Sequence, residues 1–476
     1  MRPFTKEWVT EARALGGISV SVTITMLAQL VISAVETLAV ARLGITVLAG
    51  VTLALSIYLL IFLFALGVVT AVTPIAAQAC GRNDEEGVRL AGQHALWVGL
   101  TFSLPGTVFL LGGAILLRLH GVTSEATATA DYLIGAAWGL PAWVCYVAVR
   151  SLAVATGRVN VTTAVMLAAV PLHAGLTWWL VFGGLGLPPL GATGAGLAYS
   201  LAAVLAWGLL VIIVRASSSD AFSRSLSSPF TWQAQHYQEI VRLGIPFACR
   251  IVLREGVLPA AAFIVAPFGA SAVAAHAVAA RIVDLLGVFS FGFSDAANTR
   301  AGVGIGAGNL HQVSSAGWVS VQLSAAVNVP IVILLLSEPA RLASWFLGSA
   351  DHFEIVPAAA VLPVAACVLI LEGIQSAIGG ALSGMRDAKG PLFIAVLGFW
   401  GVGLPVGFLL AHKTAVPALG VWIGLLFGAC AATLLHVIRF RRRLRRLQEA
   451  AARAADAEAA RPCPDGPFAK PETGAR

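Results

Sequence analysis

The segment LAQLVISAVETLAVARLG, residues 27–44, has the composition of a membrane helix and yet contains Gln29 and Glu36. Glu36 lies eight residues before Gly44, which places its carboxylate about 12 Å from that end of the helix at ~1.5 Å per residue. An ionisable side chain at the centre of a bilayer costs about 2.5–3.5 kcal/mol on insertion scales. Glu36 is therefore a candidate functional residue within a membrane-spanning helix.

The composition of the whole chain agrees with this interpretation. The sequence has 476 residues, of which 58% are hydrophobic and 11% are charged, whereas a soluble globular protein has about 25% charged residues. These values predict a polytopic membrane protein that is embedded in a lipid bilayer. The basic excess, with a pI near 9.4, suits an anionic membrane surface better than nucleic acid.

A span of about 20 apolar residues crosses the hydrocarbon layer. The sequence contains twelve such segments, so the predicted fold class is an all-α polytopic membrane protein. They are 14–41, 47–78, 90–118, 127–156, 161–184, 190–215, 237–266, 272–300, 312–338, 354–383, 391–412 and 417–440.

The distribution of Arg and Lys predicts the orientation of these spans. An even number of spans puts both termini on one side, and most basic residues fall on that side, including the cluster RFRRRLRR at 439–446. By the positive-inside rule both termini are cytoplasmic. We expect a multi-pass protein of the cell membrane, the inner or plasma membrane.

A Ser-rich stretch, ASSSDAFSRSLSSPF at 216–230, separates spans six and seven and has the composition of a linker. The expected organisation is a cytoplasmic N-terminus, an N-lobe of six spans, a cytoplasmic linker, a C-lobe of six spans, and a tail that begins basic and becomes disordered. Their ranges are 1–13, 14–215, 216–236, 237–440 and 441–476.

The two halves share short blocks at a constant spacing. A shift of 225 residues aligns Gly44 with Gly269 and Gly81 with Gly306. Collinear blocks at one spacing indicate a duplicated six-span unit. Secondary transporters use such repeats to build a central site between two moving halves.

Three glutamates lie inside predicted spans: Glu36, Glu255 and Glu372. Each can be a structural group paired with a buried arginine, which applies best to Glu255 because Arg250 and Arg254 lie beside it. Each can also be a site where a desolvated carboxylate exchanges a proton or Na+ for a substrate cation. Neutral oxygens suited to a cation are offered by Gln29 and Ser33 on the face of Glu36, and by Gln375 one turn after Glu372.

Other charges in the spans have structural interpretations. Arg281 and Asp284 are spaced i, i+3 in span eight and are expected to form an ion pair within the helix. Arg150 and Arg300 are expected at the membrane interface, with their stems in lipid and their head groups in water.

The chain resembles the multidrug and toxic compound extrusion (MATE) family, in its NorM-like branch. The resemblance rests on ETLAVARLGITVLAG from residue 36, LGVVTAVTPIAAQACGRNDEEGVR from residue 66, and in the second half on LGIPFACRIVLREG and GALSGMRDAKGP. It covers nearly all of the chain up to about residue 440.

The resemblance implies a twelve-helix transporter whose two pseudo-symmetric six-helix lobes enclose a V-shaped cavity. It also implies export of organic cations against an inward flow of Na+ or H+. In the NorM-like branch acids in spans one, seven and ten carry the coupling, and these positions match Glu36, Glu255 and Glu372. A Na+ ion would bind at Glu255 and Glu372.

The sequence departs from the family pattern at several positions. In span five His173 and Thr177 stand where the family tends to place amides, so an ion site wholly within the N-lobe looks incomplete. Arg250 and Arg254 are unusual beside Glu255 and either neutralise it or favour zwitterionic or anionic substrates. We count Gln29, Ser33, His173, Arg250, Arg254, Asp284 and Gln375 among the residues expected to line the cavity.

We predict a multidrug efflux antiporter that works by alternating access, with small organic molecules as substrates, no cofactor besides the coupling ion, no resident metal, and a monomeric state. The alternatives are a MATE-related flippase for lipid-linked saccharides and an exporter of anionic or zwitterionic metabolites. An intramembrane enzyme is disfavoured because there is no HExxH motif and FGFSDA (291–296) has no convincing partner histidine. A proton-pumping subunit would need midplane lysines, and none occurs between Lys6 and Lys389.

Overall fold

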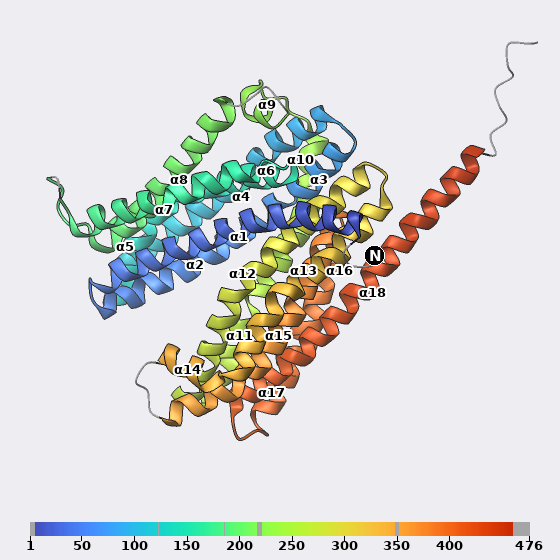
Figure 1. Cartoon of the computed structure of the whole chain (residues 1–476). Helices are drawn as coiled ribbons and strands as arrows, with labels where there is room; N and C mark the ends of the chain where they lie inside the picture. Colours follow the sequence, from blue (N-terminus) through green and yellow to red (C-terminus); the bar gives the residue numbers. More distant parts are fainter. Residues whose placement is uncertain (1–4, 122, 185, 217–220, 348–351, 460–476) are drawn as a thin grey trace, which may run out of the picture.

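The computed structural model describes residues 5–121, 123–184, 186–216, 221–347 and 352–459 (Figure 1). Within this part of the chain, 12 helical segments are long and apolar enough to cross a membrane, and each overlaps one of the predicted spans. The described residues form helices joined by short loops, so the all-α fold class is confirmed.

Six helical segments form the N-lobe, drawn from blue to green in Figure 1. Two of them are interrupted, span two between α2 and α3, and span four at a short 3-10 turn, η1. The elements are α1 (Lys6–Ala41), α2 (Ile45–Thr70), α3 (Val72–Gly81), α4 (Glu85–His120), α5 (Ser124–Ala136), η1 (Ala137–Gly139), α6 (Leu140–Ala155), α7 (Val159–Phe182) and α8 (Gly191–Ala216).

The C-lobe also has six spans, drawn from yellow-green to red, but here spans seven and eleven are the interrupted ones. Its elements are α10 (Ala234–Glu255), α11 (Val257–Val265), η2 (Ala266–Phe268), α12 (Ala270–Gly306), α13 (Leu310–Ser337), α14 (Pro339–Leu347), α15 (His352–Gly384), α16 (Lys389–Ala395), η3 (Val396–Gly403), α17 (Leu404–Ala411) and α18 (Pro417–Ala459).

The structure adds detail at the segments outside the predicted spans. The helix of span one already begins at Lys6, and the region predicted as a linker contains α9 (Ala221–Ser227), which packs on α4. The basic tail is helical as far as Ala459, as the end of α18. Residues 460–476, for which we predicted disorder, lie outside the described residues.

Proline explains why span seven breaks where it does. Pro259 has no N–H to donate to the carbonyl of residue 255, four positions earlier, and its ring crowds that carbonyl. Helix α10 accordingly ends at Glu255 and α11 begins at Val257. The break leaves the candidate residue Glu255 at a helix terminus.

The duplicated unit predicted from the sequence is visible in the backbone. Gly44 and Gly269 both precede the second span of their lobe in an extended conformation with positive φ, 115° and 97°. Asp84 and Asn309, also 225 residues apart, cap the third spans with nearly identical φ of −91° and −92° and ψ of 84°. The same cap geometry at two positions one repeat length apart agrees with a duplicated fold.

The two lobes contact each other through exchanged elements of the repeat. Helix α1 packs against α12, and its counterpart α10 packs against α2. At the end of the molecule where the chain begins, α3 also packs on α12. Gly81 and Gly306 meet there, since a Cβ on Gly81 would lie 2.9 Å from the Gly306 Cα and 2.2 Å from the Val303 carbonyl oxygen.

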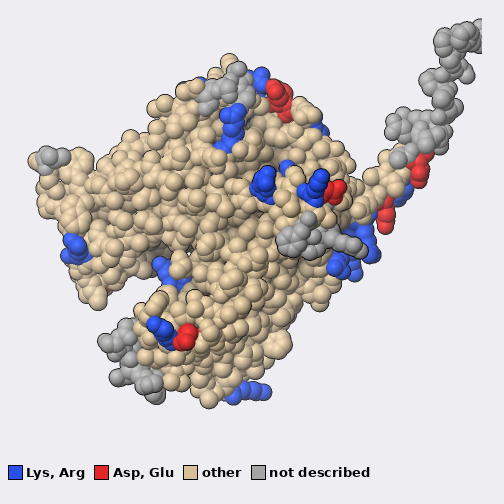
Figure 2. Space-filling view, in the orientation of Figure 1, with Lys and Arg blue, Asp and Glu red and all other residues tan. Residues whose placement is uncertain are grey.

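The lobes diverge away from this contact. Figure 1 shows them meeting near the first residues of α1 and separating toward α14, and Figure 2 shows the surface hollowed between them, with basic atoms visible in the hollow. We refer to the side where the lobes meet, which includes the first described residues of α1 and the far end of α18, as the chain-end side.

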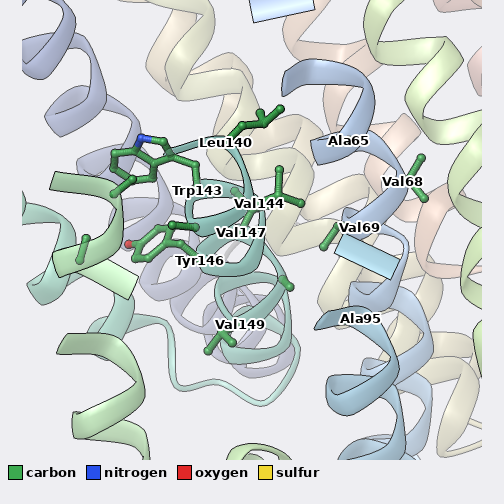
Figure 3. Close-up of a cluster of buried hydrophobic side chains, with 14 of the residues drawn as sticks. Ala65, Val68, Val69, Ala95, Leu140, Trp143, Val144, Tyr146, Val147 and Val149 are labelled. Atoms are coloured by element: carbon green, nitrogen blue, oxygen red, sulfur yellow. The ribbon is translucent and has the colours of Figure 1, made fainter. Parts of the chain in front are cut away.

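The N-lobe is organised around span four. In its 18-residue apolar segment 83% of the residues are buried, more than in any other span. Figure 3 shows Leu140, Val144 and Val147 of α6 in one buried cluster with Val69 of α2 and Ala95 of α4. This packing fixes α5 and α6 in the middle of the lobe, from where they support the N-lobe part of the candidate site.

Candidate functional site

The predicted N-lobe acid is buried within its lobe. Glu36 of α1 is 2% exposed, and the hydroxyl of Tyr132, on α5, donates a hydrogen bond of 2.6 Å to its Oε1. Tyr132 is itself fully buried. A phenol is a neutral donor, so this bond satisfies an oxygen of the carboxyl group without placing a fixed cation beside it.

Aromatic side chains surround this pair. The rings of Tyr58 and Tyr199 lie edge to face with their centroids 5.4 Å apart, and both are within electrostatic range of Glu36. Trp143 lies 5.7 Å from Tyr199, ring to ring. Our sequence analysis missed these tyrosines. A usable signal was present, because four of the five tyrosines of the chain, Tyr58, Tyr132, Tyr146 and Tyr199, fall in spans of the N-lobe.

His173 belongs to the same cluster. It is completely buried on α7, and its ring stands edge to face against Tyr199 with centroids 6.1 Å apart. Its Nε2 lies 3.3 Å from the Thr177 hydroxyl. The two residues that depart from the family pattern therefore form one polar contact behind Tyr199.

The two polar residues predicted to assist Glu36 lie elsewhere on α1. Ser33 is exposed and Gln29 is half-buried, whereas Glu36 points into the lobe. Within the described chain neither side chain forms a hydrogen bond with Glu36. The structure thus separates Gln29 and Ser33 from the buried acid, and gives Glu36 a phenol as its neighbour.

In the C-lobe the structure joins two predicted residues from different helices. The guanidinium of Arg254 on α10 donates to the carboxylate of Glu372 on α15 and forms an ion pair with it. The same guanidinium lies over the ring of Phe291, 4.8 Å from its centroid. Arg254 therefore neutralises Glu372, whereas we had expected it to act on its sequence neighbour Glu255.

Glu255 is exposed at the helix break, within electrostatic range of Arg254 and Asp284. Asp284 is exposed as well. The ion pair predicted between Arg281 and Asp284 is absent from the described chain, so that expectation is wrong. Both side chains are exposed, and an exposed pair gains little from close contact.

Arg250 lies one turn before Arg254 and is half-buried. Its guanidinium lies over the ring of Phe247, 5.4 Å from the centroid, and packs against Gly379 of α15, where a Cβ would be 3.4 Å from its Nη1. Arg250 has neither a hydrogen bond nor an ion pair with any described residue. Arg250 is therefore a cation within a membrane span, and its N–H groups donate to no described residue.

Gln375 has a structural partner. Its side-chain amide donates to the carbonyl oxygen of Ala429 on α18 over 3.2 Å, and the residue is buried. This bond ties α15 to α18 behind the Arg254–Glu372 pair.

Among the described residues, two ion pairs join the lobes on the chain-end side, and our sequence analysis did not find them. Arg150 of α6 is buried and pairs with Asp295 of α12 at 3.6 Å. Arg300 of α12 donates to both carboxylate oxygens of Glu11 of α1, over 2.9 and 2.6 Å. The expectation that Arg150 and Arg300 hold their head groups in interfacial water is therefore wrong, because each head group is neutralised by an acid of the other lobe.

A hydrogen bond accompanies these ion pairs. The side-chain amide of Gln78 on α3 donates to the carbonyl oxygen of Gly384 on α15 over 2.9 Å. Polar contacts between the lobes thus gather on the chain-end side, opposite the wide end of the hollow.

Comparison with known proteins gives a consistent result. A family model described as MatE matches residues 22–179 and 259–409. The probable multidrug resistance protein NorM of Bradyrhizobium diazoefficiens is 32% identical over 435 residues, 90% of this chain and 93% of that protein. The probable multidrug resistance protein NorM of Rhodopseudomonas palustris is 33% identical over 451 residues, 93% of this chain and 94% of that protein.

Among solved structures, a MATE crystal structure in the bent conformation superposes with a TM-score of 0.84 at 20% identity. The superposition covers 94% of this chain and 100% of that chain. At this level of identity the match concerns the fold.

Proposed function

Since the chain belongs to the MatE family, whose members are multidrug transporters and not enzymes, we propose that it is a NorM-like antiporter. It exports organic, mainly cationic compounds in exchange for Na+ or H+ by alternating access. It acts in the cell membrane as a monomer, with both termini in the cytoplasm.

The observation that carries this proposal is the pair of acid sites, one in each lobe. Glu36 is held by Tyr132 within the N-lobe, and Glu372 is held by Arg254 within the C-lobe. Glu36 is buried and Glu372 is half-buried, and a carboxylate within a membrane span that either a coupling cation or a substrate cation can neutralise supports exchange of one for the other. Glu255, at the break of span seven, adds an exposed carboxylate.

The neighbours of Glu36 favour H+ over Na+ in the N-lobe. Na+ is a hard cation that needs several oxygen ligands, in the manner of other hard cations. Glu36 is surrounded by rings and one phenolic donor, which suit a carboxyl group that gains and loses a proton. In the C-lobe Arg254 already compensates Glu372, so a Na+ ion would have to displace a guanidinium.

Ethidium transport into proteoliposomes under an imposed Na+ or H+ gradient tests this proposal. We expect transport driven by the H+ gradient, and its loss in Glu36→Gln. Glu125→Gln makes the same chemical change at an exposed position of α5 and should transport normally. Transport by Glu36→Gln at the rate of Glu125→Gln would show that Glu36 does not carry coupling.

Arg250 favours a second candidate function, the export of anionic or zwitterionic compounds. A guanidinium with no hydrogen bond or ion pair to any described residue matches a carboxylate or phosphate. Arg250→Gln should reduce export of a compound that bears a carboxylate and leave ethidium export unchanged. Arg341→Gln, at an exposed position of α14, serves as the control. Equal export of the acid by both variants would remove this candidate.

A further inference from the structure

A second cavity lies outside the hollow between the lobes, on the chain-end side. Its volume is about 570 Å³. It is formed by the first half of α10, the turn between α15 and α16, and the middle of α18 at Arg439 and Arg443. None of the acids assigned to coupling lines it.

The cavity has a surplus of positive charge. Of the described residues that line it, five are basic and two are acidic. Both acids are committed, Glu239 to Arg386 in an ion pair and Asp387 to Arg439 through two hydrogen bonds of 2.6 and 2.8 Å. The other three cations are exposed and have no ion pair with any described residue: Arg242, Lys389 and Arg443.

Hydrogen bonds and close packing hold in place the turn that carries part of this charge. Asp387 is buried and also accepts a hydrogen bond from the Gly390 N–H over 3.2 Å. A Cβ at Gly390 would lie 1.7 Å from Arg439 Nε, so only glycine lets Arg439 lie across this turn to reach Asp387. Arg386 holds the turn in the left-handed region with φ 57°. The paired charges thus form a frame, and the unpaired ones face the cavity.

The cavity also has an apolar side. Leu243 and Pro246 of α10 line it. Next to them along the chain, Ile245 is 41% exposed, and Phe393 of the adjoining α16 is 64% exposed. Exposed apolar side chains of this kind on a membrane-spanning helix face lipid. The cavity therefore lies where charged and lipid-facing surfaces of the protein meet, and Figure 2 shows Lys and Arg side chains grouped where α18 leaves the helical body.

We propose that this cavity binds the phosphate headgroup of an anionic phospholipid from the leaflet on the chain-end side. Arg242, Lys389 and Arg443 hold the phosphate, and Leu243 and Pro246 contact the glycerol and upper acyl region. Basic pockets between membrane helices at the cytoplasmic surface attract anionic headgroups, and the attraction grows with each Lys or Arg. The occupant joins α10, which begins the C-lobe, to α18, which ends it.

Binding to the purified full-length protein in detergent tests the proposal. Native mass spectrometry would measure the affinity of phosphatidylglycerol and of phosphatidylcholine with the same chains. We expect a preference of about tenfold or more for phosphatidylglycerol in the unmodified protein. The triple variant Arg242→Gln, Lys389→Gln, Arg443→Gln should lose that preference.

The matched control also removes three positive charges, but from positions on α18 that do not line the cavity. It carries Arg442→Gln, Arg445→Gln and Arg446→Gln, all at exposed positions of α18 that do not line the cavity, and should keep the preference. Thermal unfolding without added lipid confirms that both triple variants are folded. An equal loss in both variants would assign the effect to overall charge, and an equal preference in the unmodified protein and the cavity variant would place the lipid elsewhere. Both results overturn the proposal.

A competition arm separates lipid from soluble phosphate. Millimolar inorganic phosphate should leave bound phosphatidylglycerol in place, because it lacks the apolar contacts. Complete displacement by inorganic phosphate would identify the cavity as a site for a soluble anion instead. Since the readout is binding, the result does not depend on whether the protein proves to be an antiporter.

Discussion

At the scale of single residues, the N-lobe acid depends on one hydrogen bond donor. The Tyr132 hydroxyl donates to Glu36 over 2.6 Å in a buried site. Tyr132→Phe removes that donor and leaves a buried oxygen without it, which costs about 1–3 kcal/mol. We expect a lower thermal unfolding temperature and a changed pH profile of transport, measured in proteoliposomes at a series of external pH values.

Tyr146→Phe is the control for this prediction. The Tyr146 hydroxyl donates to the carbonyl oxygen of Thr162 over 2.7 Å in the same lobe, so its removal also lowers stability. It should leave the pH profile unchanged, because its partner does not titrate. If both variants gave the same profile, Tyr132 would have a structural role alone.

At the scale of helices, the contact between α3 and α12 requires two glycines. A Cβ on Gly306 would lie 2.1 Å from the carbonyl oxygen of Gln78, and backbone cannot move aside as a side chain can. Gly306→Ala should therefore destabilise the closed chain-end side by about 1–3 kcal/mol. Thermal unfolding of the purified protein measures this loss.

Gly112→Ala gives the opposite expectation on a membrane helix without such a contact. No atom of the described residues lies within 4 Å of a Cβ at Gly112 of α4, so alanine there should be neutral or stabilise by up to about 1 kcal/mol through helix propensity. A Gly306→Ala protein as stable as Gly112→Ala would mean that α3 and α12 separate at no cost.

At the scale of the whole molecule, the interlobe ion pairs should bias which side of the protein is open. Arg300→Gln leaves the buried Glu11 unpaired, and breaking a buried pair in this way costs up to about 3–5 kcal/mol. We expect the lobes to separate on the chain-end side in a larger share of molecules. Spin labels at the exposed positions Arg82 and His311, one on each lobe, would report a longer distance.

The exchanged pair Glu11→Arg with Arg300→Glu tests whether charge pairing is the cause. It restores opposite charges at the same contact and should bring the short distance back. A distance that stays long in the exchanged pair would indicate packing as the cause, and a distance unchanged in Arg300→Gln would remove the ion pair from the closing mechanism.

Much of this protein was predictable from its sequence because the relevant physics is local. The apolar length of a segment decides whether it spans the bilayer, so the 12 spanning helices were found in order. The constant spacing of Gly44 with Gly269 and Gly81 with Gly306 revealed the repeat, because Gly44 and Gly269 meet the same backbone requirement of a turn with positive φ, and Gly81 and Gly306 are at equivalent places in the two lobes. The cost of a buried charge likewise singled out Glu36, Glu255 and Glu372 one at a time.

The partner of each charge was decided only by the tertiary structure. Arg254 adjoins Glu255 in the chain but pairs with Glu372, 118 residues away, because its side chain reaches from α10 to α15 whereas Glu255 is exposed at the helix break. Arg150 and Arg300 find their acids across the lobe interface. A buried charge is costly unless an opposite charge lies close to it. Contacts between distant helices determine which group provides that opposite charge. The spacing of residues along one helix does not encode those contacts.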